Sequence, residues 1–387
     1  MNRIRIVLAD AGSLPRYPQG GGHWSCLLQY LFGLNALGHD VFWLEVLQSN
    51  GNAASDQQRV SRFFHRFKRY GFAGRCALLL YDAAVTEPTI EGARVYGMTK
   101  RRVREVAADA DMLWNFACGL REPLLSLFKR RVLIDLDPGH LQVSALTKEM
   151  AIHDHDAFLT VGTNVQEPDC EIPGLGLKWR PFFPFVYLPL WNVVPDPGEK
   201  ALFTSVTEWT WEELWMDDRV LSVSKRDAYL KYIELPERSC RPFEIAANID
   251  PEDTTGDREM LEKHRWRLVH PHSIARTPGA YRRYIRRSRA EFLCPKPIHR
   301  ILRTGWTSDR SACYLASGRP VLMEDTGLGA QLPTGEGLLT FSELGEAAEK
   351  VAEIDADYTR HARAARALAE EFMDSRKCLE RMLAASG

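Results

Sequence analysis

The residues with the clearest capacity for chemistry lie in one stretch, 303–327, which reads as loop, helix, turn, strand and loop. Thr307 or Ser308 can cap the helix, because a short side-chain oxygen accepts hydrogen bonds from the free N–H groups of the first turn. Gly318 can end the helix, since glycine adopts the left-handed conformation that is common at helix C-termini. The apolar residues 321–323 then predict a short buried strand.

This order places a helix N-terminus beside carboxylates at the end of a strand. The N–H groups of a helix N-terminus bind phosphate oxygens, and Glu324 and Asp325 can accept hydrogen bonds from sugar or ribose hydroxyls. Ligands of open α/β sheets bind at the carboxyl ends of the strands. The pattern therefore fits a phosphorylated sugar, but a capped helix packed on a sheet without any ligand fits it equally well.

The same stretch resembles a known family. Residues 305–322 (GWTSDRSACYLASGRPVL), 325–327 (DTG) and 332–339 (LPTGEGLL) look like the C-terminal half of group 1 glycosyltransferases with the GT-B fold. Within that branch they are most similar to the spore-maturation-protein-like glycosyltransferases. Many group 1 enzymes carry two glutamates eight positions apart here, where this sequence has Gly305 and Cys313. The usual contacts of those glutamates with the donor therefore do not carry over.

The resemblance implies an α/β chain of the GT-B fold, with two Rossmann-like domains facing each other across a cleft. A Pro- and aromatic-rich segment, 178–197, interrupts the alternation of strands and helices, because proline sustains neither a helix nor a central strand. We therefore expect an N-terminal acceptor-binding domain over 1–193 and a C-terminal nucleotide-sugar-binding domain over 194–357. Residues 358–387 are expected to form a C-terminal helix that crosses back to the N-terminal domain.

The start of the chain predicts a βαβ unit, with strands at 4–9 and 41–45 and a helix at about 25–37. It resembles the start of GT-B enzymes, in which the loop after the first strand faces the cleft and often presents the general base. His23 is the candidate base, because an unperturbed histidine has a pKa near ~6.5 and accepts a proton near neutrality. A role in shaping the loop also fits His23. Trp24 is expected either to wall the acceptor site or to lie in the core.

A second polar group follows the strand expected at 131–135. Asp135, Asp137, His140 and Gln142 stand at its carboxyl end, where a parallel sheet binds ligands. These residues predict an acceptor-binding pocket, with Asp137 as a second catalytic candidate if the acceptor is a good nucleophile. A capped tight turn fits the same residues equally well.

GT-B enzymes generally need no catalytic metal, so cationic side chains and helix N-termini must stabilise the departing diphosphate. Lys296, Arg303 and Arg310 are the candidate cations, because a guanidinium fork or an ammonium group suits phosphate. No metal-ligand spacing occurs, so we expect no metal site and no cofactor beyond the nucleotide-diphosphate sugar as co-substrate. The residues expected to bind the donor are Gly22, Lys296, Arg303, Thr304, Gly305, Ser308, Asp309, Arg310, Ser311, Glu324, Asp325, Thr326 and Gly327.

The composition limits the classes of partner and the cellular compartment that we expect for this protein. A net charge of −1 predicts no nucleic acid and no anionic membrane as a main partner. The eight cysteines lack CxxC spacing, which is typical of reduced thiols in a cytoplasmic protein. The first ten residues read as a strand rather than a signal peptide, and no apolar run reaches the ~18 residues of a membrane span. The expected partners are a nucleotide-sugar donor and a small-molecule or glycan acceptor, for a monomer or homodimer.

The resemblance implies a hexosyl- or deoxyhexosyl-transferase. Two alternatives stay open: a nucleotide-sugar epimerase or hydrolase on the same fold, and a non-catalytic sugar-binding partner protein, which the missing glutamate pair favours. The arginines at 282, 283, 286 and 287 are expected to form a solvated helix face rather than a phosphate site.

Overall fold

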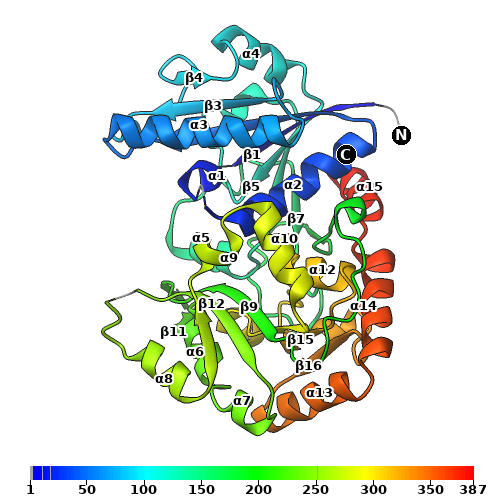
Figure 1. Cartoon of the computed structure of the whole chain (residues 1–387). Coiled ribbons are helices and arrows are strands. Elements are labelled where there is room, and N and C mark those ends of the chain that lie inside the picture. Colours follow the sequence, from blue (N-terminus) through cyan, green and yellow to red (C-terminus); the bar gives the residue numbers. More distant parts are fainter. Residues whose placement is uncertain (1–2, 11, 18, 251) are drawn as a thin grey trace.

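Two β-sheets, one in each half of the chain, organise the molecule (Figure 1). The computed structural model describes residues 3–10, 12–17, 19–250 and 252–387. In the first sheet, β4 is antiparallel to β3 and the other pairs are parallel. The first sheet runs in spatial order through β4 (Arg94–Tyr96), β3 (Cys76–Tyr81), β2 (Asp40–Gln48), β1 (Arg5–Asp10), β5 (Met112–Phe116), β6 (Arg131–Asp135), β7 (Ala157–Thr160) and β8 (Trp179–Pro181).

The second sheet is parallel throughout, and its strand order reverses between β9 and β14, as the first sheet's order does between β1 and β5. Ligands of such sheets bind outside the carboxyl ends of the strands at this reversal. The second sheet runs through β13 (Trp266–Val269), β12 (Phe243–Asn248), β9 (Phe203–Glu208), β14 (Ala290–Leu293), β15 (Val321–Glu324) and β16 (Leu338–Phe341).

Helices cover both faces of each sheet, which is why a strand such as β3 is buried along its whole length and reads as a continuous apolar run. The Trp-rich segment after β9 forms a hairpin of β10 (Glu213–Met216) and β11 (Arg219–Ser222). The helices up to the C-terminal tail are α1 (Ser13–Arg16), α2 (Gly21–Ala36), α3 (Ala53–Arg69), α4 (Lys100–Ala108), α5 (His140–Thr147), α6 (Lys225–Leu230), α7 (Leu235–Arg238), α8 (Asp257–Lys263), α9 (Pro271–Ala275), α10 (Pro278–Arg287), α11 (Pro297–Ile301), α12 (Asp309–Ala316) and α13 (Leu344–Ala356).

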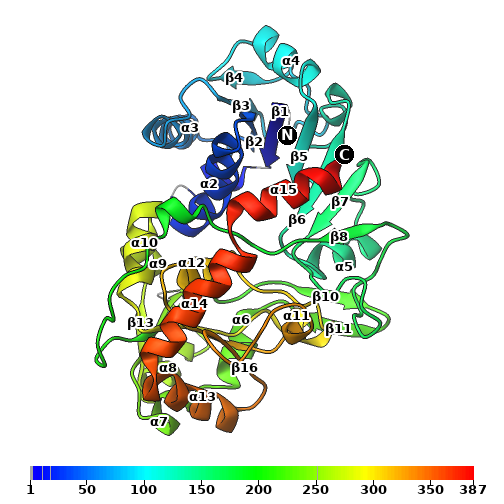
Figure 2. The ribbon, with the colours of Figure 1, turned by 90° about the vertical axis from the view of Figure 1, so that its right-hand side faces the viewer.

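The chain returns to the first domain at its C-terminus, as expected. The tail forms two helices, α14 (Tyr358–Phe372) and α15 (Ser375–Ser386), and aspartates cap both of them: Asp357 accepts from Arg360 N and Asp374 from Arg376 N. Figure 2 shows α14 along the second domain and α15 across the first. The close contact of α15 with α2 uses Gly33, where an added Cβ would lie 2.3 Å from Leu379 Cδ1.

The start of α2 differs from the expectation. The helix begins at Gly21 rather than near Ser25, so His23 lies in the first helical turn and not on a loop. Gly21, two residues before His23, instead allows close packing of the two domains. An added Cβ at Gly21 would lie 2.0 Å from Ala275 O, at the junction of α9 and α10.

We therefore predict that Gly21→Ala destabilises the protein by about 1–3 kcal/mol, because the new methyl group must push the α9–α10 junction away. Gly22→Ala is the matched control, since its Cβ would meet only the Tyr281 ring at 3.5 Å. Alanine in place of a helical glycine is otherwise neutral or stabilising. Thermal and urea unfolding of the two variants measure the difference, and equal stabilities would contradict the close approach.

Candidate functional site

A buried ion pair holds the first turn of α12 against β14. Arg310 Nε donates to Glu291 Oε1 at 2.5 Å, and Ser311 Oγ donates to Glu291 Oε2 at 2.6 Å. Burial opposes charge here, yet the Glu291 carboxylate raises the pKa of Arg310 above its ordinary value. Arg310 Nη2 has no hydrogen-bond partner among the described residues. Arg310 is thus a permanent cation that is buried beside Glu291.

Two further cations share this environment. Desolvation, together with the nearby charges of Arg310 and Lys296, lowers the pKa of Lys225 to about 7. Lys225 Nζ lies 5.7 Å from the ring centre of Trp306. Trp306 stacks in turn on His299, with centroids 4.5 Å apart and planes inclined by 3°. Lys225 is therefore a desolvated amine close to two other cations, and an anion bound beside it would raise its pKa.

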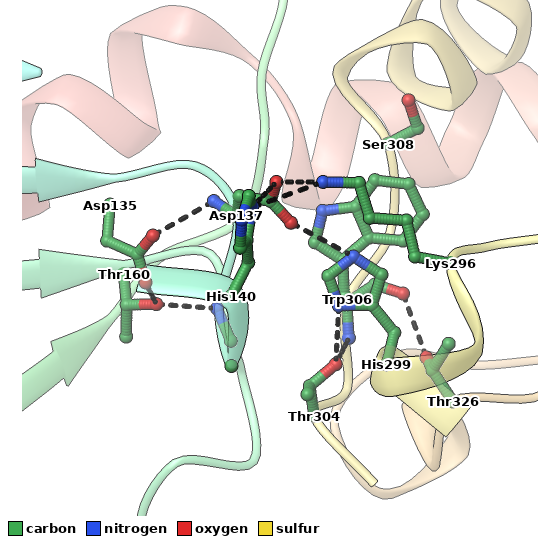
Figure 3. A network of polar contacts seen from close by, with 12 residues as sticks. Asp135, Asp137, His140, Thr160, Lys296, His299, Thr304, Trp306, Ser308 and Thr326 are labelled. Carbon is green, nitrogen blue, oxygen red and sulfur yellow. Dashed lines mark hydrogen bonds and ion pairs between the residues drawn. The ribbon is translucent and has the colours of Figure 1, made fainter. Parts of the chain in front are cut away.

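Asp137 joins the two domains at this point (Figure 3). Its carboxylate pairs with Lys296, accepts from His140 Nδ1 at 3.0 Å and lies 3.3 Å from His299 Nε2. Burial would raise the pKa of Asp137, but Lys296, His140 and His299 hold it well below its usual range. A carboxylate held this way is a weak base, so its placement favours a clamp between domains over the catalytic role expected for it.

Asp135 and Gln142 are buried inside the first domain rather than facing an acceptor, which corrects their expected placement. Asp135 accepts from Gln142 Nε2 at 2.9 Å and Thr160 Oγ1 at 2.7 Å, and burial raises the pKa of Asp135 to about 6. His140 remains at the surface between the domains, where its Nε2 lies 3.2 Å from Glu212 Oε1. Of the two alternatives, a capped tight turn and an acceptor-binding pocket, the turn agrees better with the observed positions of Asp135 and Gln142.

Trp24 belongs to the core. Its side chain is 1% exposed, packs on Phe63 and Phe67, and donates from Nε1 to Leu14 O at 3.2 Å. Trp24 therefore does not line an acceptor site in this structure. Of its two expected placements, the core is the one observed.

The loop before α12 is closed by the first domain. Thr163 Oγ1 donates to Gly305 O at 2.8 Å, and Asn164 Nδ2 donates to Gly327 O at 2.9 Å. An added Cβ at Gly305, whose φ is +65°, would lie 2.4 Å from Thr163 Oγ1. No side chain fits at Gly305 without moving Thr163 or Asn164. The buried members of the predicted donor set are Thr304, Gly305, Ser308, Arg310, Ser311, Glu324, Thr326 and Gly327.

The strand-end carboxylates are used within the protein. Glu324 is buried and accepts from Tyr232 OH at 2.8 Å, with Lys231 Nζ 3.4 Å away. Asp325 Oδ1 accepts from the backbone N of Gly327 at 2.9 Å. Both carboxylates therefore have partners within the protein, which corrects the expectation that they are free to accept hydrogen bonds from sugar hydroxyls.

Arg303 pairs with Asp169 of the first domain at 2.7 Å, and both side chains are about half exposed. This pairing separates it from the group of Lys225, Lys296 and Arg310. No local sequence signal distinguishes Lys225 from other lysines, since its desolvation depends on Trp306 and on cations distant in the chain.

His23 faces the second domain. Desolvation lowers the pKa of His23 below 6.5, and the carboxylates of Asp309 and Glu208 partly oppose that shift. The ring is exposed and stacks on Tyr17, with centroids 5.5 Å apart. Gly22 beside it lies near the Tyr281 ring of α10. The imidazole is thus neutral near pH 7 and accessible, as a proton acceptor must be.

No group of three or more His, Cys, Asp or Glu side chains able to hold a metal ion occurs among the described residues. Within the same ranges, no helix is long and apolar enough to cross a membrane.

No protein-family model matches the sequence, and no curated protein matches it. Solved structures do match. An alpha-glucosyltransferase in complex with UDP-glucose and DNA containing an abasic site has a TM-score of 0.61 at 10% identity, covering 100% of both chains. Anabaena Alr3699/HepE in complex with UDP and glucose has a TM-score of 0.58 at 11% identity, covering 99% of this chain and 100% of that one. The likeness confirms the expected fold, GT-B with two Rossmann-like domains.

The prediction from net charge that nucleic acid is not a partner is wrong. Several matched structures, including one with a 13-mer DNA, hold DNA on this fold. A net charge of −1 sums over the whole chain and does not describe the charge of any one face.

The two arginines predicted to bind diphosphate differ in their structural roles, which generates a prediction about stability. Arg310→Ala leaves Glu291 buried without its cation and should cost about 3–5 kcal/mol. Arg303→Ala removes a half-exposed pair and should cost about 0–1 kcal/mol. Urea unfolding measures both values. Similar small losses in the two variants would show that the Glu291–Arg310 pair does not hold α12 in place.

Proposed function

We propose that this protein is a glycosyltransferase that moves a sugar, a hexose or deoxyhexose, from a nucleotide diphosphate donor to an acceptor. The single observation that carries the proposal is the group formed by Lys225, Lys296 and Arg310: Arg310 Nη1 donates to Val206 O of β9, Lys296 follows the end of β14, and both side chains lower the pKa of Lys225. The matched structures support it, since an alpha-glucosyltransferase and HepE of the same fold hold UDP. Membership of the spore-maturation-protein-like group stays a prediction from sequence resemblance.

The electrostatics of the three cations suit a diphosphate. In the free protein the charges of Lys296 and Arg310 disfavour a charged Lys225, although Asp137 pairs with Lys296 and Glu291 with Arg310. A diphosphate between them replaces repulsion by attraction, and its affinity grows as charge develops on the leaving group. These side chains supply the stabilisation that a metal ion would otherwise give, so we propose a metal-independent reaction.

His23 is the proposed general base. It lies on the first turn of α2, across from Asp309 at the start of α12. As the acceptor hydroxyl attacks the anomeric carbon, its proton passes to the neutral imidazole and the bond between sugar and diphosphate breaks. The departing diphosphate stays with the cations of the second domain.

Incubation with a panel of nucleotide sugars, with and without EDTA, tests the proposal by release of the nucleoside diphosphate. Acceptors in the panel should include glycans, small molecules, DNA and RNA. Transfer to one acceptor identifies a transferase, whereas release with water alone identifies a hydrolase and an altered sugar identifies an epimerase. Absence of any donor binding would overturn the proposal.

Lys225 provides a specific prediction about UDP binding. Because the pKa of Lys225 is about 7, the amine is partly neutral above pH 7, and a bound diphosphate must raise that pKa. UDP binding should therefore take up protons, and its affinity should fall as pH rises above 7. Calorimetry in buffers of different ionisation enthalpy measures the uptake. Lys225→Gln should abolish it and weaken UDP by about 1.5–3 kcal/mol, while the exposed Lys263→Gln on α8 should change neither.

His23 sets the acid side of the pH profile. The fraction of neutral imidazole falls as pH drops through a pKa below 6.5, so kcat/KM should fall there too. His23→Ala should lower kcat by roughly a hundred- to ten-thousand-fold and leave UDP binding unchanged. His153→Ala, at an exposed turn, is the control. Near-normal turnover in His23→Ala would remove this residue from the mechanism.

A further inference from the structure

Two long segments of the chain contain no acidic residue. The first spans 57–75, with basic residues at 59, 62, 66, 68, 69 and 75. The second spans 264–290, with arginines at 265, 267, 276, 282, 283, 286, 287 and 289. In a chain whose net charge is −1, these segments concentrate positive charge that acidic residues elsewhere balance.

The fold brings the two segments together on one face. In both Figure 1 and Figure 2, α3 of the first domain lies on the same side as α9 and α10 of the second. Arg66 Nη2 on α3 donates to Arg276 O at 2.9 Å. Tyr70 lies close enough to Arg69, Arg66 and Arg282 for all three to lower its pKa against the larger effect of burial. The arginine surface, as we call these exposed parts of α3, α9 and α10, therefore crosses the domain boundary.

Much of this charge is unneutralised. Arg62, Arg69, Arg276 and Arg283 are exposed, and none of them has an acidic partner among the described residues. Glu244 compensates Arg267 and Arg287 only. A groove of about 630 Å³ adjoins the exposed arginines of α10. Its lining includes Ser273, Ile274, Arg283, Tyr284, Arg286 and Arg287.

The surface ends at the proposed base. Gly21, two residues before His23, touches the α9–α10 junction, and α1 packs on α3. Tyr17, which follows α1 and stacks on His23, is 47% exposed. An extended anion on the arginine surface would thus pass an exposed aromatic ring and reach the His23 imidazole.

We propose that the arginine surface binds the phosphate backbone of a nucleic-acid acceptor, a role in substrate recognition that rests on the proposed transferase function. Regularly spaced phosphates match guanidinium forks spread over two domains, and an exposed aromatic ring suits an unpaired base. An anionic membrane fits less well, because it needs apolar anchors among the cations. Among the described residues, the exposed large apolar side chains other than Tyr17 are Leu146, Val193, Trp211, Trp215 and Val220, none of which is on α3, α9 or α10.

Fluorescence anisotropy with labelled single-stranded DNA, duplex DNA and single-stranded RNA tests the proposal across a range of salt concentrations. Binding should weaken steeply with salt, as counterions are released from the phosphates. Arg62→Gln/Arg69→Gln/Arg283→Gln should weaken binding roughly a hundredfold and reduce the slope of log K against log salt by about two to three. The matched control is Arg101→Gln/Arg104→Gln on α4, whose arginines pair with Glu105 and Glu91.

Each outcome either supports or overturns nucleic-acid binding by the arginine surface. Loss of binding in the triple variant alone, with normal UDP affinity, supports the proposal. Three outcomes overturn it: no oligonucleotide binding by the wild type, equal loss in the α4 control, or binding only to anionic phosphatidylserine vesicles. UDP calorimetry tests the transferase function separately. Oligonucleotide binding without UDP binding would refute the proposed transferase function but would still support nucleic-acid binding by the arginine surface.

Discussion

The buried pair of Glu291 and Arg310 is the interaction on which the candidate site depends. Burying two charges is costly unless geometry and additional hydrogen bonds compensate, and here Ser311 occupies the second carboxylate oxygen. The pair ties α12 to the edge of β14, so it also sets where the α12 N-terminus, Asp309 and Arg310 Nη2 lie. His23 on the other domain then meets α12 at a defined place.

The site is a product of two domains packed closely at glycines. Gly21 and Gly305 are positions at which a Cβ would collide with the opposite domain, at 2.0 Å and 2.4 Å respectively. Between them, Asp137 neutralises Lys296, whereas Lys225 and Arg310 have no such partner from the first domain. The three cations therefore differ in availability: Lys296 and Arg310 each have a carboxylate partner, whereas desolvation lowers the pKa of Lys225.

Charge is distributed unevenly over the molecule. A near-zero net charge conceals an acid-free surface on α3, α9 and α10, because the sum carries no positional information. The arginines of α10 that read as a solvated face in the sequence lie on the same side of the molecule as the basic residues of α3 in the other domain. Their significance comes from that juxtaposition rather than from their number.

The sequence by itself determined the α/β class, the restart of the strand pattern after the Pro-rich linker and a helix cap at Thr307 or Ser308, because these follow from local periodicity and capping residues. The GT-B architecture followed from the family resemblance of residues 305–339. The sequence also indicated an anion site near Arg310. Only the tertiary structure decided which polar residues are available. Asp135, Gln142 and Glu324 find partners on neighbouring strands and helices, and Trp24 is covered by α3. Desolvation by burial, with the charges of Arg310 and Lys296, gives Lys225 its low pKa, since desolvation and charge depend on what lies nearby in space, not on what lies nearby in sequence.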